Sequence, residues 1–206
     1  MELVFATNNP GKLREIEDLL GSDFRLRSLK DIGFEGDIPE TNPTLEENAS
    51  AKAFYIYNRY SVSCFADDTG LEVDALNNEP GVYSARYAEL DGNKVFGSRG
   101  ELTGANIDKL LRLLKDKDSR KARFRTVISL VLDGAEHRFE GIAPGMIIDE
   151  RRGAEGFGYD PVFVPEESSR TFAEMSLGEK NRISHRAIAF RKLVSFLTEQ
   201  RDDRSP

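Results

Sequence analysis

Apolar residues recur along the chain with two different periods, and these periods predict strands and helices in alternation. The run at residues 2–6 is typical of a strand, whereas the apolar positions between 13 and 20 recur at helical spacing. Thr44 and Glu47 have the spacing of a capping box, which predicts a second helix through about Tyr57. The first part of the chain therefore alternates strand and helix.

The middle of the chain is richer in β-type patterns. A buried strand is predicted at 62–66, and Gly70 is expected to close a turn before the next apolar run. Asp133 and Gly134 form a strong hairpin signal between strands at 124–132 and 138–148.

A final amphipathic helix is expected after Ser184, which is suited to cap it. We therefore predict an α/β fold with a mixed sheet and flanking helices. The expected domains are a single domain over residues 1–200 and a polar tail at 201–206.

Composition and charge narrow the functional classes. The 206 residues suffice for one core, or for two lobes that share one sheet. A net charge of −7 argues against binding of long nucleic acid. No apolar run approaches the roughly 18 residues of a membrane span, and the N-terminus does not resemble a signal peptide. The single cysteine, Cys64, excludes an internal disulfide and indicates a reducing, cytoplasmic location.

Asp67 and Asp68 are the most informative residue pair. They follow the predicted buried strand, and two adjacent carboxylates favour a metal ion, a proton or a cationic ligand. Mg²⁺ acting on a phosphate is the commonest use of such a pair, and the alternative is a turn with solvated acids.

The segment 7–12 has the features of a phosphate site. A strand leads through a tight turn into a helix N-terminus, where the helix dipole and Lys12 favour an anion. The segment is not a Walker A loop, because Leu13 follows the lysine. Its alternative reading is a capped helix with an exposed lysine.

Two further segments suit a nucleoside. Glycines flank Phe157, so the backbone can approach a ligand while the ring offers a stacking face. His185 and Arg186 lie in the first turn of the last predicted helix, where cations oppose the helix dipole and suggest an anionic or acceptor-rich ligand. The alternatives are a core phenylalanine in a turn and solvent-exposed charges.

Taken in order, these segments resemble the inosine triphosphatase family of non-canonical purine nucleoside triphosphate pyrophosphatases. The resemblance extends from Phe5 to about Leu197. The segments that carry it are 7–12, 47–49, 66–71, 80–86, 156–161 and 184–186. It implies Mg²⁺-dependent hydrolysis of ITP, dITP and XTP to the monophosphate and pyrophosphate. It also implies an elongated mixed sheet, two lobes around a nucleotide-binding cleft, and a homodimer.

The resemblance also assigns roles to residues. Asp68 is expected to be the catalytic carboxylate and, with Glu40, a metal ligand; the register around Glu40 is uncertain, and Glu47 is a rival. The substrate-binding residues expected near the triphosphate are Thr7, Asn8, Asn9, Pro10, Gly11, Lys12, Lys52, Thr69 and Arg86. Those expected around the base and sugar are Phe157, Gly158, Tyr159, Asp160, Lys180, His185 and Arg186.

Other functions remain open from the sequence. A related enzyme could cleave pyrimidine nucleotides, although histidine and arginine donors suit a purine with keto acceptors. A non-catalytic nucleotide sensor could keep the phosphate site but would not need both Asp67 and Asp68. A role as a scaffolding protein would not explain the many glycine-rich and polar segments.

Overall fold

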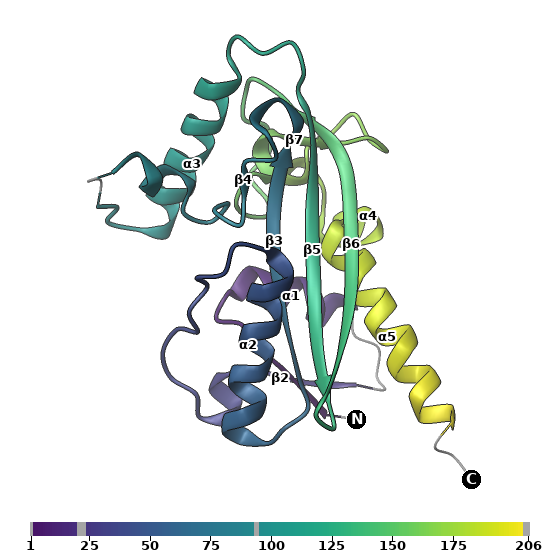
Figure 1. Cartoon of the computed structure of the whole chain (residues 1–206). Helices are drawn as coiled ribbons and strands as arrows, with labels where there is room; N and C mark the ends of the chain where they lie inside the picture. Colours follow the sequence, from purple (N-terminus) through teal and green to yellow (C-terminus); the bar gives the residue numbers. More distant parts are fainter. Residues whose placement is uncertain (1, 20–23, 93–94, 204–206) are drawn as a thin grey trace. The chain divides into compact units, whose positions relative to one another are not determined.

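The computed structural model describes residues 2–19, 24–92 and 95–203 (Figure 1). The chain divides into two compact units. Unit 1 contains the chain up to Asp68, residues 126–142 and the chain from Ser184 onward; unit 2 contains residues 69–125 and 143–183.

Seven strands, five α-helices and five short 3-10 helices make up the regular structure of the described chain. The strands are β1 (Glu2–Phe5), β2 (Arg25–Arg27), β3 (Cys64–Val73), β4 (Pro80–Gly81), β5 (Lys121–Leu132), β6 (Ala135–Ile147) and β7 (Phe163–Pro165). The helices are α1 (Pro10–Leu19), α2 (Leu45–Tyr60), α3 (Arg99–Leu114), α4 (Leu177–Ile183) and α5 (His185–Asp203). β3, β5 and β6 each pass from one unit into the other.

The strands form one mixed sheet in the order β2-β1-β3-β5-β6-β7, with β4 beside β3. β1 is parallel to both β2 and β3, whereas β3–β4 and β6–β7 are antiparallel. Asp133 and Gly134 both have positive φ angles, as the tight turn between β5 and β6 requires. The α/β class and the mixed sheet predicted from the sequence are confirmed.

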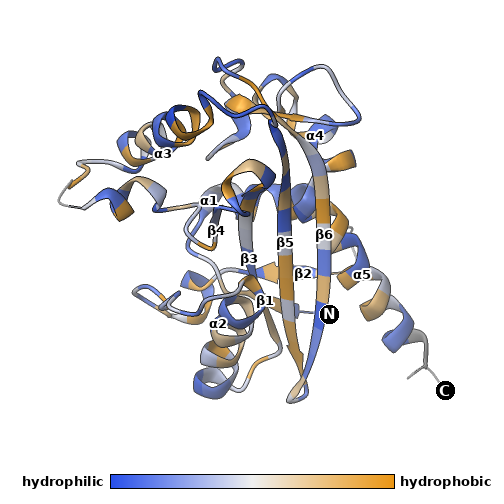
Figure 2. Cartoon of the chain, turned by 45° about the horizontal axis from the view of Figure 1, so that its top comes forward, coloured by the Kyte–Doolittle hydropathy of each residue, from blue (hydrophilic) through white to orange (hydrophobic). Residues whose placement is uncertain are grey.

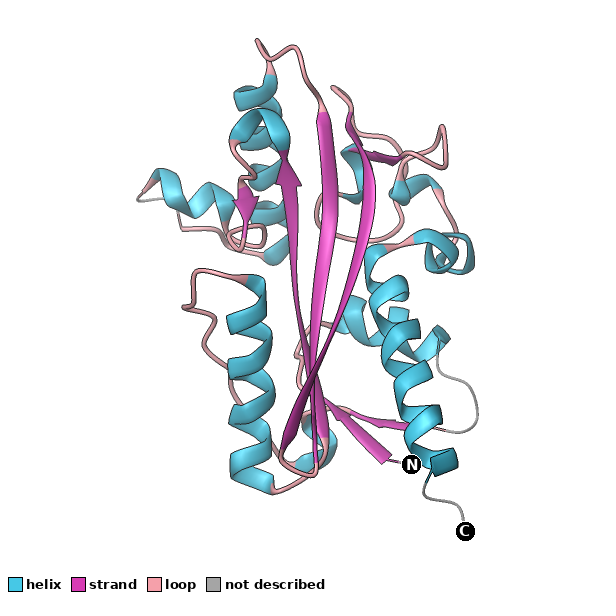
Figure 3. Cartoon of the chain, turned by 45° about the vertical axis from the view of Figure 1, so that its right-hand side comes forward, coloured by secondary structure: helices cyan, strands magenta, loops and turns pink. Residues whose placement is uncertain are grey.

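In unit 1 the strands are covered on both faces (Figure 3). On one face, Phe5 and Phe65 stack with ring centroids 4.5 Å apart and pack with residues of α1 and α5. On the other, Val4 and Cys64 join a cluster with residues of α2. Because successive side chains of a strand point to opposite faces, β1 and β3 are apolar on both sides.

Unit 2 has its own apolar cluster. Leu71 of β3, Leu110 of α3, and Phe124 and Phe163 of the strands are members. Figure 2 shows that hydropathy changes along β5, which begins with hydrophilic residues and continues into a hydrophobic stretch.

Local sequence signals identify the starts of α1, α2 and α5 correctly. The Asn9 side chain accepts a hydrogen bond from the Gly11 amide at 2.9 Å. Thr44 accepts one from the Glu47 amide at 3.2 Å, and Ser184 accepts one from the third residue of α5. Each of these contacts satisfies a backbone donor that the helix itself cannot.

The turn expected at Gly70 is wrong. β3 continues without interruption through Asp67, Asp68 and Gly70 to Val73. A Cβ atom at Gly70 would lie 2.7 Å from the carbonyl oxygen of Gly81 in β4. This glycine therefore permits close strand pairing rather than a turn.

The polar tail expected at 201–206 begins as helix, because α5 extends to Asp203; residues 204–206 lie outside the described residues. Over the part of the chain that the structure describes, no helix combines the length and apolar character that crossing a membrane requires.

Candidate active site

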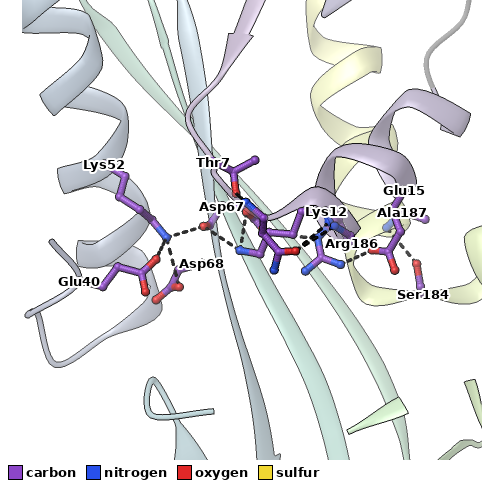
Figure 4. Close-up of polar contacts among 12 residues, drawn as sticks. Thr7, Lys12, Glu15, Glu40, Lys52, Asp67, Asp68, Ser184, Arg186 and Ala187 are labelled. Carbon is purple, nitrogen blue, oxygen red and sulfur yellow. Dashed lines mark hydrogen bonds and ion pairs between the residues drawn. The ribbon is translucent and has the colours of Figure 1, made fainter. Parts of the chain in front are cut away.

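Asp67 and Asp68 lie within β3 and point to opposite faces of the strand. Asp67 is directed to the side of α1 and α5, where it contacts Lys12 and Arg186. Asp68 is directed to the side of α2, where it contacts Lys52. The alternation of side chains along a strand requires this arrangement. The two acids are therefore not a pair that shares one ligand, and each has its own cations (Figure 4).

On the Asp67 side, two helices supply the cations. Oδ1 of Asp67 lies 2.7 Å from Nζ of Lys12 in α1, and Oδ2 lies 3.2 Å from Nε of Arg186 in α5. Arg186 also forms an ion pair with Glu15, which follows Lys12 by one helical turn. All these side chains except Lys12 are almost fully buried.

On the Asp68 side, Lys52 of α2 is the central group. Its ammonium contacts Glu40, donates to the Asp67 carbonyl oxygen at 2.7 Å, and lies 3.3 Å from Oδ1 of Asp68. Asp68 is only 6% exposed. Its Oδ2 atom is buried and accepts no hydrogen bond within the described residues.

Burial and neighbouring charges set the ionisation of these groups. Burial raises the pKa of Asp68, although Lys52 and Lys12 act in the opposite direction. Burial also opposes the charge on Asp67, but Lys12 and Arg186 outweigh it and lower the pKa of Asp67. The pKa of Asp68 is thus raised and the pKa of Asp67 is lowered. Opposite shifts in neighbouring carboxyl groups are typical of sites where the two groups have different roles.

Burial also acts on the two lysines. It lowers the pKa of Lys12, and Asp67 only partly opposes this effect. It would lower the pKa of Lys52 as well, but Asp68 and Glu40 outweigh burial and raise that pKa. An added phosphate group near Lys12 would favour its charged form.

The turn before α1 has the predicted cap but few unused amides. Thr7 accepts a hydrogen bond from the Asn9 backbone amide. The Asn9 side chain caps α1, which begins at Pro10, by accepting a hydrogen bond from the Gly11 amide. Asn8 contacts the loop carbonyl of residue 36 at 2.7 Å. The attraction for an anion at this turn therefore rests on Lys12 and the helix dipole.

Unit 2 contains the other predicted cluster. Lys180 of α4 is buried, forms an ion pair with Asp160 at 2.7 Å, and lies 5.0 Å from the ring centroid of Phe157. Asp160 also accepts the Phe157 amide at 2.8 Å. Gly156 has a φ of 76°, and a Cβ atom there would lie 2.1 Å from the Asp160 carboxylate. These contacts fix the loop that presents Phe157.

The remaining predicted residues are Tyr159, Gly158, Arg86, Thr69 and His185. Tyr159 is buried and donates to the Ser84 carbonyl at 3.0 Å, while Gly158, next to it, has a φ of 63°. The guanidinium of Arg86 lies 5.4 Å from the Tyr83 ring centroid. The last two positions are Thr69, which follows Asp68 in β3, and His185, which is buried at the start of α5.

Sequence reasoning missed the role of Glu15, and it left the role of Asp67 undefined. Glu15 lies beside Ile16 on the buried side of α1, and a buried acid one turn after Lys12 was the available signal. Its partner Arg186 is 171 positions away, so only the tertiary structure brings the two together.

The carboxylates near Lys52 fit a divalent cation that is also bound by substrate. Within the described residues, no group of three or more His, Cys, Asp or Glu side chains forms a metal-ligand set. Mg²⁺ usually needs only one or two carboxylates, because water and substrate phosphates complete its shell. The buried Oδ2 atom of Asp68 and the carboxylate of Glu40 are suitable donors.

Comparisons with known proteins find similarity along nearly the whole chain. The model of the Ham1 family matches residues 3–196. A dITP/XTP pyrophosphatase of Christiangramia forsetii is 52% identical over 97% of this chain and 100% of that protein. A Porphyromonas gingivalis protein of the same name is 51% identical over 95% of this chain and 97% of that protein.

A solved structure is similar over nearly the same length. The HAM1 protein of Coxiella burnetii matches with a TM-score of 0.84 and 38% identity, over 97% of this chain and 99% of that one. The family model and the full-length relatives establish the same membership, and the chain belongs to the Ham1 family.

Proposed function

We propose that this chain is a nucleoside triphosphate pyrophosphatase that hydrolyses non-canonical purine nucleotides, namely ITP, dITP and XTP. The products are the monophosphate and pyrophosphate, so the enzyme removes deaminated purines from the nucleotide pool. Relatives named dITP/XTP pyrophosphatase match nearly the whole chain. The observation that carries the proposal is Asp68, a buried carboxylate with an oxygen atom that accepts no hydrogen bond within the described residues.

The reaction requires attack of water on the α-phosphorus. A bond forms from the water oxygen to phosphorus, the bridge between the α and β phosphates breaks, and pyrophosphate leaves. Asp68 is the group that orients this water and accepts its proton. Its raised pKa suits a general base, because proton affinity increases with pKa.

Phosphoryl transfer leaves little covalent chemistry for the protein to do. Positioned cations that stabilise the negative charge developing on the leaving pyrophosphate therefore supply much of the catalysis. Lys12 at the start of α1 and Lys52 of α2 are the cations of unit 1 assigned to the phosphates. The helix dipole of α1 adds to this attraction. Thr7, Asn8 and the rest of the α1 turn position the chain around these groups.

A divalent cation completes the site, and Mg²⁺ is the proposed ion. When bound, Mg²⁺ supplies Lewis-acid stabilisation of the phosphate charge. Asp68 and Glu40 are the proposed ligands, because both contact the same Lys52 ammonium. Among the ion pairs of the described residues, Glu47 has none with Lys52, which favours Glu40 over its rival.

Base recognition is assigned to the Phe157 loop. Stacking of a base on an aromatic ring contributes about 1–3 kcal/mol. The Lys180 ammonium next to this ring has three N–H donors, and a donor suits the keto oxygen at position 6 of inosine and xanthine. Tyr159 and Asp160 hold the loop, and His185 is a further proposed donor.

The resemblance extends the proposal to assembly and location. A homodimer in the cytoplasm is proposed, and the lone Cys64 is buried, as suits a protein that uses no disulfide. The cleft between two lobes, and the roles of Thr69 and Arg86 near the phosphates, stay predictions.

The test is to incubate the purified protein with ITP and Mg²⁺ and to separate the products by ion-exchange chromatography. We expect IMP and pyrophosphate in equal amounts, and no product when Mg²⁺ is chelated. IDP with inorganic phosphate would refute the assigned bond cleavage. Binding of ITP without turnover would favour the nucleotide-sensor alternative, and turnover of UTP or CTP alone would favour the pyrimidine enzyme.

A further inference from the structure

We infer that Arg186 and Glu15 are positioning residues for the phosphate-binding lysine, Lys12, and that Arg186 does not read the base. The inference rests on the proposed function, because it assigns the triphosphate to Lys12. It concerns three linked ion pairs within unit 1 that join Lys12, Asp67, Arg186 and Glu15. The backbone of α1 between Lys12 and Glu15 completes the circuit, which we name the Lys12 ring.

The Lys12 ring joins three elements of unit 1. Lys12 and Glu15 are one helical turn apart on α1, so their side chains emerge on the same face of the helix. Arg186 comes from α5 and bridges Glu15 to Asp67 of β3, and Asp67 in turn contacts Lys12 (Figure 4). One turn of α1 is thus fixed at both ends, through Lys12 and through Glu15.

Arg186 is occupied by these carboxylates. Its side chain is 1% exposed, Nε lies 3.2 Å from Asp67, and Nη1 contacts Glu15. The planar guanidinium is suited to bridge two carboxylates, because its N–H donors have a fixed geometry. The charge of Arg186, which opposes the dipole of α5, is therefore balanced by carboxylates of the chain itself. No bound ligand is needed to account for this cation.

Fixing Lys12 has a consequence for binding. A lysine side chain has four rotatable bonds, and ordering it on substrate binding costs conformational entropy. Asp67 holds the ammonium at 2.7 Å before substrate arrives, so part of that cost is already met in the free protein. Buried ion pairs are weak stabilisers, but they are suited to fixing a geometry.

The test uses inorganic tripolyphosphate, a probe that has the phosphates but no base. The main variant is Glu15→Gln/Arg186→Met, which removes one anion and one cation and leaves Asp67 paired with Lys12. Calorimetric titration with magnesium tripolyphosphate should show affinity lowered about tenfold or more, the size of one lost charge-assisted contact. The ratio of kcat/KM for ITP over ATP should stay within about twofold of the parent ratio.

A second variant and a matched control keep the result interpretable. Glu15→Gln alone should give a smaller loss of tripolyphosphate affinity, and it serves if the double variant does not fold. The triple variant Glu15→Gln/Arg186→Met/Lys12→Ala should bind tripolyphosphate about as weakly as the single variant Lys12→Ala. All three changes affect the same interaction, so their effects should not add. The exposed pair Glu2 and Arg25, 3.1 Å apart, provides the control Glu2→Gln/Arg25→Met, with parental affinity expected.

The inference is overturned if the folded double variant binds tripolyphosphate like the parent. It is also overturned if the ITP preference collapses while tripolyphosphate binding is retained, since Arg186 would then read the base. A parent protein that hydrolyses no ITP would overturn the proposed function instead, and the tripolyphosphate titration would still decide the role of the Lys12 ring.

Discussion

Replacement of Asp68 by asparagine is expected to abolish turnover while leaving the fold intact. Asparagine keeps the shape of the side chain but loses the charge and the proton acceptor. The buried Oδ2 atom, which accepts no hydrogen bond within the described residues, is the atom whose function is removed. Lys52 retains Glu40 and the Asp67 carbonyl as partners, so no buried cation is left unpaired.

The structure gives both a size and a sign for this change. Loss of a general base lowers kcat by about 10²–10⁴-fold, which corresponds to about 2.7–5.4 kcal/mol of transition-state stabilisation, and a weakened metal site adds to it. Stability should change in the opposite direction. The folded pKa of Asp68 is raised, so at neutral pH its charge opposes folding, and Asp68→Asn should unfold at the same or a higher temperature. That difference should vanish as the pH falls below the unfolded pKa, about 4.

The assay is steady-state pyrophosphate release from ITP with saturating Mg²⁺, together with thermal unfolding at pH 7. Asp74→Asn is the matched control, because Asp74 is an exposed carboxylate just after the same strand, and we expect parental values. Activity of Asp68→Asn within a few-fold of the parent would refute the assignment. A large loss of melting temperature would refute the argument from burial.

Other predictions follow from the neighbouring residues. Lys12→Ala should lower kcat/KM for ITP by about 10- to 150-fold, mainly through KM, and an unchanged value would mean that Lys12 contacts no phosphate. Lys52→Met should lower the melting temperature in EDTA, because Asp68 and Glu40 lose their shared cation. Added Mn²⁺ should raise the melting temperature of this variant more than that of the parent, and equal increases would contradict the proposed ligands. Burial raises the pKa of Cys64 to about 12, so the native thiol should resist alkylation at pH 8 and react in urea. The free energy of unfolding should decline above about pH 9, where only the thiol of the unfolded chain ionises.

Local sequence signals sufficed for much of the fold. Caps at Asn9, Thr44 and Ser184, and the Asp133-Gly134 turn, act within a few residues and were readable from the chain. Gly70 was misread because its role depends on a neighbouring strand, β4, which approaches its Cα closely. A glycine in a strand and a glycine in a turn look the same in sequence.

The sequence singled out several residues that the structure brings together in unit 1, but it did not predict their geometry. The adjacent Asp67 and Asp68 indicated a metal ion, a proton or a cationic ligand, yet the alternation of side chains along the strand places them on opposite faces. The sequence showed an unfavourable cation at Arg186, but the compensating carboxylate of Glu15 lies at the other end of the chain. Ion pairs between residues far apart in the chain produce no periodic pattern in the sequence, so only the tertiary structure reveals them.

The central claim is that this protein selects nucleotides with a keto oxygen at position 6 of the purine. ATP carries an amino group there, which would face protein donors such as Lys180 in a desolvated site. An unpaired buried polar group costs about 1–3 kcal/mol, and more beside a charge. A difference of this size corresponds to a factor of about 5–150 in kcat/KM.

The most direct measurement is kcat/KM for ITP, dITP, XTP, GTP and ATP under one condition, with pyrophosphate release as the readout. We expect ITP, dITP and XTP each to exceed ATP in kcat/KM by at least about fivefold. Rejection of GTP requires a further donor facing position 2 of the purine, and it is the less direct part of the expectation. Comparable kcat/KM values for ITP and ATP would contradict the account.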